Sequence, residues 1–184
     1  MKNTLAILFA LLSINSFAQD KNNYVTFNTL TPVQGTPYTI ASSVHRGKAE
    51  IHSSHLMFIN TLTGQTVQQD FPADAYIADV KQIHIDSLGL HKVLIAGRTI
   101  NLDNNKSIDW NDPFQVYICS VDGTGRVQIT DDRFFADHWQ VNPWTGVIVI
   151  TGHRDTNTNG KLDKTDLPEI IVYDLNKMAL VKKI

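Results

Sequence analysis

The sequence predicts an all-β protein made of about three four-stranded antiparallel sheets. Apolar runs of strand length alternate along the chain with short segments rich in Gly, Asn, Asp and Pro, which is typical of strands joined by turns. Glu50 and Glu169 are the only glutamates among 18 acidic residues, whereas aspartate, which favours turns over helices, is abundant. Part of the strand pattern also repeats along the chain. These observations favour sheets built from consecutive strands and few helices.

The first element of the chain reads as an export signal. A short positive segment, Met1–Asn3, precedes the apolar run Leu5–Ile14, and Ser16–Ala18 provides the small residues that signal peptidase requires. An apolar run of about ten residues is too short to anchor a protein in a bilayer, because a spanning helix needs about 20 residues. We therefore expect a cleaved signal peptide over residues 1–18, a periplasmic or secreted protein, and no membrane span.

The composition of the mature domain, residues 19–184, limits the functions open to it. The formal net charge of the full chain, −2, provides no basic surface for nucleic acid or anionic membranes. Cys119 is the only cysteine, so no intrachain disulfide can form, and its place in the run Val116–Cys119 favours a buried thiol. The nucleophile elbow, the zinc-binding helix motif and the phosphate-binding glycine loop are all absent from the sequence. The sequence therefore predicts no catalytic residues.

An internal repeat organises the mature domain. A shift of 54 positions aligns Val93–Ala96 with Val147–Ile150, and Val116–Ile118 with Ile170–Val172, without a gap. A third copy with a shorter connector lies upstream, and each copy reads strand–strand–loop–strand–turn–strand. The expected repeats span approximately residues 24–78, 79–132 and 133–184.

Two segments of this repeat resemble a known family. The run VYICSVDGTGRVQITDD, Val116–Asp132, is similar to the "I/V-Y-x-x-x-x-D-G-x-x-x-x-x-L-T-D-D" segment of TolB-like, WD40-like (PD40) β-propeller repeats. His138–Asp155 resembles the "W-S-P-D-G-x-x-I-A-F-x-S-x-R-D" core of that family, although Trp144-Thr145 stands where Pro-Asp would precede the glycine. The resemblance implies propeller-type blades and a protein or peptide partner.

Three blades form only part of a propeller, because closed propellers typically have about 4–8 blades. Two chains could pair as a homodimer with six blades, the number usual in TolB-like proteins. Alternatively, the chain could complete the propeller of a partner, or it could be a truncated reading frame.

The segment Asp155–Asp166 carries the most specific chemical signal, because it fits a twelve-residue Ca²⁺-binding loop. Gly160 at position 6 permits the sharp turn, and we expect Leu162 at position 8 to pin the loop to the core. The loop resembles an EF-hand-type loop that ends in Asp, as dockerin-like loops do. An Asx-rich hairpin loop without metal is the alternative. The expected Ca²⁺ ligands are Asp155, Asn157, Asn159, the Lys161 carbonyl, Asp163 and Asp166.

The repeat supplies a second loop of this kind, Asn101–Asp112. It keeps oxygen-bearing side chains at positions 1, 3, 5, 9 and 12, with Ile108 at the core-facing position 8. Lys106 replaces the glycine at position 6, which makes the turn harder to form. The expected Ca²⁺ ligands here are Asn101, Asp103, Asn105, the Ser107 carbonyl, Asp109 and Asp112.

Histidine and tryptophan residues offer further candidate sites. His84 and His138 align under the 54-residue shift, which favours a shared packing or hydrogen-bonding role over metal binding. Trp110, Trp139 and Trp144 could line a sugar- or peptide-binding face, but aromatic residues in such sheets favour the core.

These expectations combine into one functional hypothesis. The sequence favours an exported, non-enzymatic propeller-type module that binds a protein or peptide partner, with Ca²⁺ rigidifying two loops. The alternative is a propeller fragment or accessory domain of an exported hydrolase or glycan-processing enzyme whose catalytic residues lie elsewhere.

Overall fold

The computed structural model describes residues 27–43 and 55–184. These residues form an all-β structure of three four-stranded antiparallel sheets, as predicted, and contain no α-helix. No helix in this part of the chain has the length and apolar content needed to cross a bilayer. The predicted signal peptide, residues 1–18, and the connector around residues 44–54 lie outside the described residues.

Each sheet consists of four strands that follow one another in the sequence. The first sheet contains β1 (Thr29–Pro32), β2 (Tyr38–Ser42), β3 (His55–Asn60) and β4 (Thr66–Asp70). The middle sheet contains β5 (Tyr76–Ile85), β6 (Leu90–Arg98), β7 (Phe114–Ser120) and β8 (Val127–Gln128), with the short 3₁₀ turn η1 (Asp86–Leu88) between β5 and β6. The last sheet contains β9 (Phe134–Asn142), β10 (Val147–Arg154), β11 (Leu167–Asp174) and β12 (Ala179–Lys183).

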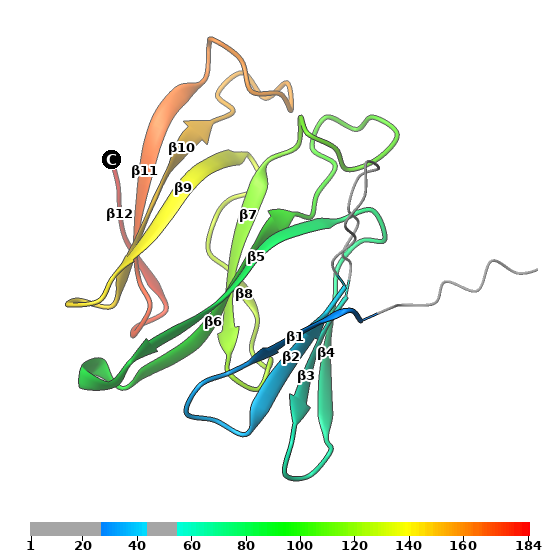
Figure 1. Cartoon of the computed structure of the whole chain (residues 1–184). Coiled ribbons are helices and arrows are strands. Elements are labelled where there is room, and N and C mark those ends of the chain that lie inside the picture. Colours follow the sequence, from blue (N-terminus) through cyan, green and yellow to red (C-terminus); the bar gives the residue numbers. More distant parts are fainter. Residues whose placement is uncertain (1–26, 44–54) are drawn as a thin grey trace, which may run out of the picture.

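The three sheets lie side by side, with the green middle sheet between the blue-to-cyan first sheet and the yellow-to-red last sheet (Figure 1). None of them closes into a barrel, and the arrangement is consistent with three propeller-type blades. Predicted strands are present throughout, but β1 and β4 were not predicted individually. The polar β4 sequence TVQQD is an edge strand, and its side chains alternate between exposed and half-buried positions, so it carries a weak apolar signal.

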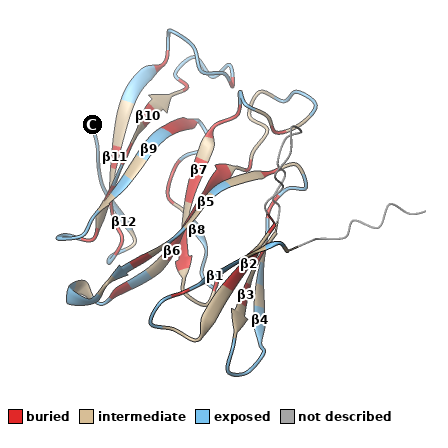
Figure 2. Ribbon diagram, viewed as in Figure 1, coloured by how far each residue is buried: buried red, intermediate tan, exposed pale blue. Residues whose placement is uncertain are grey.

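Two apolar layers hold the sheets together, and the middle sheet contributes to both because its side chains alternate between faces. Burial of each large aliphatic side chain contributes about 1.5–3 kcal/mol, so these layers dominate the stability of the stack. Figure 2 shows buried positions along the middle sheet and exposed residues mainly at the turns. The layer between the first and middle sheets includes Ile40, Phe58, Val93, Ile95 and Cys119. The layer between the middle and last sheets includes Leu94, Ile118, Ile148, Ile150 and Ile171.

Two glycine-containing bulges define how the middle and last sheets correspond. Gly97 and Gly152 each lie at a register shift, and an added Cβ would lie 2.6 Å from the Tyr76 carbonyl oxygen or 2.1 Å from that of Phe135. The two glycines are therefore equivalent positions, 55 residues apart. The predicted gapless shift of 54 is wrong for the second strand of each repeat, because the last sheet has one residue fewer between the bulge and the third strand.

The same bulges separate two histidines that the sequence alignment placed together. In the middle sheet, Gly97 pairs with Ile77, and its neighbour Ala96 pairs with Asp79. In the last sheet, Thr151, the neighbour of Gly152, pairs with His138. Asp79 is therefore the counterpart of His138, and the prediction of equivalent roles for His84 and His138 is wrong. Register is fixed by cross-strand pairing, which a linear comparison of residues does not contain.

Candidate functional site

The structure brings the two predicted metal loops into contact. The first loop, Asn101–Asp112, joins β6 to β7, and the second loop, Asp155–Asp166, joins β10 to β11. A Cβ added to Gly160 would lie 2.6 Å from the Leu102 carbonyl oxygen, so the two loop backbones touch there. The contact places both loops at one end of the middle and last sheets (Figure 1).

Asp155 anchors the second loop from its first position. Its side chain is fully buried, and its two carboxylate oxygens accept hydrogen bonds from the backbone N–H groups of Asn159 at 3.1 Å and Gly160 at 3.0 Å. Arg133 Nη1 lies 3.3 Å from the same carboxylate and supplies the compensating charge. A buried carboxylate needs such partners, because an uncompensated charge is costly away from water.

The two loops share one hydrogen-bond frame despite their different sequences. In each loop, the Asp at position 12 accepts backbone N–H bonds from positions 2 and 9, at distances of 2.7–3.1 Å. The N–H of position 5 donates to the side chains of positions 1 and 3, at 3.1 Å in every case. Position 4 has a positive φ in both loops, 54° at Asn104 and 60° at Thr158. The frame therefore depends on Asn and Asp side chains that accept backbone hydrogen bonds.

The side chains at positions 3, 5 and 9 of the second loop converge on one another. Asp163 Oδ2 accepts hydrogen bonds from Asn157 Nδ2 at 3.0 Å and from Asn159 Nδ2 at 2.7 Å. Its Oδ1 accepts two more from the hydroxyl and backbone N–H of Thr165. These hydrogen bonds, with those from Thr165 the strongest, hold the pKa of Asp163 well below its usual range.

This oxygen-rich donor set fits a hard cation such as Ca²⁺. Asn157 Oδ1 and Asn159 Oδ1 each accept one backbone N–H bond and keep a second lone pair, which a small rotation of the side chain could turn toward a cation beside Asp163. The hydrogen bonds described above would then be replaced by metal–oxygen bonds. In the first loop, Asp109 is the acceptor that corresponds to Asp163, at 2.9 Å from Asn105 Nδ2.

Position 8 behaves differently in the two loops. Ile108 is buried, as predicted, and packs in the layer between the first and middle sheets. Leu162 is 50% exposed, so the prediction that it pins the second loop to the core is wrong. The close contact between Gly160 and the first loop fixes the second loop in its place.

A groove of about 460 Å³ lies between the end of the first loop and the middle of the second. Arg98 lines the groove, with its guanidinium carbon 4.0 Å from the ring centroid of Phe114 and 5.2 Å from that of Trp110. Within the described chain, the only hydrogen bond of Arg98 is from Nε to the Asp112 carbonyl oxygen, at 3.0 Å. Burial lowers the pKa of Arg98. The groove is lined mainly by Arg98, Trp110, Phe114, Asp137, Lys161 and Leu162.

The sequence reasoning missed this groove. The expectation that the tryptophans are core residues is wrong for Trp110 and Trp144, which are 67% and 88% exposed, whereas Trp139 packs partly against the core. The polar neighbours of Trp110 in the sequence DWND were a signal of exposure. Cys119, by contrast, is buried as predicted, and burial raises the pKa of its thiol to about 12.

A histidine–aspartate cluster was also missed. The cluster consists of His84, Asp86 and His91, whose donor atoms all lie within 4.8 Å of one another. Among the described residues, no other group of three His, Cys, Asp or Glu side chains brings its donor atoms this close. The carboxylates of the two loops do not meet this criterion, since each loop also relies on Asn side chains and carbonyl groups. The signal in the sequence was the spacing H-x-D-x-x-x-x-H across a tight hairpin.

The chain matches no protein-family model, no curated protein and no solved structure. The resemblance to TolB-like propeller repeats therefore stays a prediction.

Proposed function

We propose that the chain is an exported, non-enzymatic binding module that recognises a peptide segment of a partner protein in the groove beside the two loops. The observation that carries this proposal is Arg98. Its planar guanidinium is stacked on an aromatic ring, and its terminal nitrogens have no hydrogen-bond partner within the described chain. Half-buried donors in a groove gain most from an acceptor supplied by a ligand.

The chemistry of the groove defines the occupant. A guanidinium with two free terminal nitrogens suits a carboxylate, which can accept two parallel hydrogen bonds. Trp110 and Leu162 flank Arg98 with exposed apolar surface. The best fit is a peptide that places an acidic side chain against Arg98 and an apolar side chain next to it.

In this proposal, Ca²⁺ stiffens the two walls of the groove. Trp110 belongs to the first loop, and Lys161 and Leu162 belong to the second. Ordering these loops before a ligand arrives reduces the entropy cost of binding. Export, which the N-terminal sequence predicts, would bring the module to compartments where Ca²⁺ is plentiful.

Peptide selection on the immobilised chain tests the proposal. We expect a random peptide library displayed on phage to yield a consensus with an acidic residue beside an aromatic or aliphatic one. Arg98→Ala should lower the affinity for the selected peptide by at least about tenfold, as loss of an interface anchor does. Arg126→Ala is the matched control, because Arg126 also stacks on an aromatic ring, 4.3 Å from the Phe71 centroid, but away from the groove. Equal binding by wild type and Arg98→Ala would contradict the proposal.

We extend the proposal to a homodimer, in which a second copy covers the open face of the last sheet. The side chains on this face alternate with core residues and are apolar at Val149, Ile170 and Val172. When the sheets are aligned by their bulge glycines, these three positions correspond to Leu94, Val116 and Ile118 of the middle sheet. Those residues pack against the last sheet.

A second copy would offer the open face of its first sheet, which carries Met57 and Ile59. Two such contacts related by a twofold axis would complete a closed ring. Light scattering across a concentration series should show a dimer that Val149→Lys weakens. Val127→Lys, at a similarly exposed valine on edge strand β8, should not weaken it. A wild-type chain that stays monomeric at every concentration would refute the dimer.

A further inference from the structure

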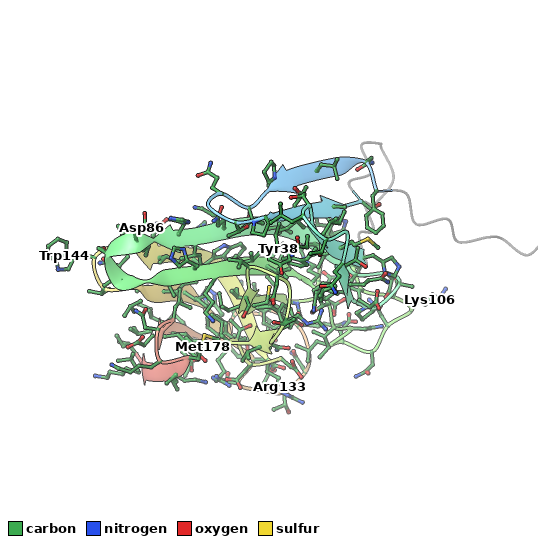
Figure 3. All side chains as sticks on the ribbon, turned by 90° about the horizontal axis from the view of Figure 1, so that it is seen from below. Tyr38, Asp86, Lys106, Arg133, Trp144 and Met178 are labelled. Atoms are coloured by element: carbon green, nitrogen blue, oxygen red, sulfur yellow. The ribbon has the colours of Figure 1, made fainter. Side chains whose placement is uncertain are left out.

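We propose that His84, Asp86 and His91 form a binding site for Zn²⁺ or another divalent transition metal of similar preference. The site is independent of the peptide groove and of the Ca²⁺ loops. Figure 3 places Asp86 and Lys106 at opposite ends of the molecule, so the cluster and the first loop are far apart.

The β5–β6 hairpin brings the three residues together. His84 and His91 are directly opposite each other in the ladder, and the turn Asp86–Leu88 joins their strands. Ile83 and Leu90, their neighbours in sequence, point into the layer shared with the last sheet. Both imidazoles therefore project from the opposite face of the hairpin, toward the first sheet.

The donor atoms are nearly in place for a metal. His84 Nε2 lies 2.7 Å from Asp86 Oδ1, and His91 Nε2 lies 3.9 Å from the same oxygen. All three donor atoms lie within 4.8 Å of one another. In a tetrahedral zinc site with bonds near 2.0–2.1 Å, neighbouring ligand atoms are roughly 3.3 Å apart. The observed separations lie on either side of that value, so small side-chain rotations suffice.

The surroundings hold His84 in this orientation. Its Nδ1 lies 3.3 Å from Gln82 Nε2, and the Gln82 amide in turn exchanges two 2.8 Å hydrogen bonds with the backbone of Gln34. A Cβ added to Gly35 would lie 3.1 Å from His84 Cε1, so the ring also packs against the first sheet. A ligand fixed by a second layer of contacts loses little freedom when it binds a metal.

The donor set selects the class of metal. Two imidazole nitrogens and one carboxylate oxygen suit Zn²⁺, Cu²⁺ or Ni²⁺, whereas Ca²⁺ takes oxygen ligands. Asp86 is 82% exposed in its side chain, so the remaining coordination position faces solvent. Zn²⁺ binds deprotonated ligand atoms, so the affinity should fall as the pH is lowered. Without a metal, the His–Asp contact would serve only to stabilise the hairpin.

Calorimetric titration with ZnCl₂ distinguishes these two roles. The chain is prepared without a histidine tag, stripped of metal, and titrated in excess Ca²⁺ so that the acidic loops do not take up Zn²⁺. We expect one tight site per chain, which His84→Ala or His91→Ala weakens by at least about tenfold. His153→Ala is the matched control, because His153 Nδ1 lies 3.3 Å from Asp137 Oδ2 but has no place in the three-donor cluster.

Two results would overturn the inference. One is a wild-type chain that takes up no Zn²⁺, and the other is a His84→Ala/His91→Ala double variant that binds it as tightly as wild type does. All three side chains are partly or largely exposed, so the variants should keep the wild-type circular dichroism spectrum. Shifts of the His84 and His91 imidazole nitrogen resonances on addition of Zn²⁺ provide a second readout. Loss of peptide binding in the groove would leave these results unchanged.

Discussion

The first and second loops have the same hydrogen-bond frame, but they differ in sequence, and the differences at positions 1, 6 and 8 are instructive. The shared bonds all join Asn or Asp side chains to backbone N–H groups within the same loop. Positions 1, 6 and 8 differ because they contact different surroundings. The comparison separates residues that build a loop from residues that attach it to the rest of the molecule.

The attachments of the second loop are more demanding than those of the first. Asp155 at its first position is fully buried beside Arg133, whereas its counterpart Asn101 is half-buried and neutral. Gly160 has a φ of 75° and touches the first loop, whereas its counterpart Lys106 is exposed and has no positive φ. The first loop is attached instead through Ile108, which is buried.

The largest contrast is expected at position 1. Asp155→Ala would leave the N–H groups of Asn159 and Gly160 and the cation of Arg133 without their acceptor, at a cost of about 2–4 kcal/mol. Asn101→Ala removes a more exposed side chain and should cost about 0.5–1.5 kcal/mol. Urea denaturation in chelator measures both values. Equal losses would show that burial does not distinguish the two loops.

Calcium tests whether the shared frame is a shared metal site. At about 100 times the dissociation constant, Ca²⁺ should stabilise the fold by about 2.7 kcal/mol per independent site. Thermal unfolding with Ca²⁺ and with chelator measures the shift of the midpoint. Asp166→Ala and Asp112→Ala should each remove the part of this stabilisation that one loop contributes. If the wild-type midpoint does not move, both loops are held by hydrogen bonds alone.

A glycine pair sharpens the comparison at position 6. Gly160→Ala places a Cβ against the Leu102 carbonyl and adopts an unfavourable φ, so it should destabilise the fold by about 1–3 kcal/mol. Gly125→Ala is the matched control, because Gly125 has a φ of 64° but faces open space, and it should cost about 1 kcal/mol. Similar values for the two variants would mean that backbone strain, not the contact between loops, requires Gly160.

The smallest expected effect is a pH dependence at position 9. The folded-state pKa of Asp163 lies below its usual value of 3.8, so its contribution to stability is present above that pH. It is lost as the pH falls through the folded-state pKa, because protonation breaks the hydrogen bonds from Thr165 and Asn159. The free energy of unfolding of Asp163→Asn should therefore decline less steeply below about pH 4 than that of wild type, as acid unfolding measures. An unchanged slope would assign the acid sensitivity to other carboxylates.

Local features of this molecule could be predicted from the sequence, and non-local ones could not. Most strands and the burial of Cys119 depend on neighbours in the chain, and the structure reproduces them. The bulge at Gly152 depends on pairing between strands, so the register of the repeat was mispredicted. The groove requires Arg98 and Leu162 to meet across two sheets, and no periodicity in the sequence records that meeting.

The pairing of strands that follow one another in the chain has a consequence for folding. Each ladder joins two consecutive strands across a single connection, so contact order is low for a β protein and each sheet can form before its neighbours dock. Among the described residues, the middle sheet is covered on both faces, whereas the outer sheets are each covered on one. Opening should start at the outer sheets, and the amide hydrogens of β6 and β7 should be the last to exchange with solvent.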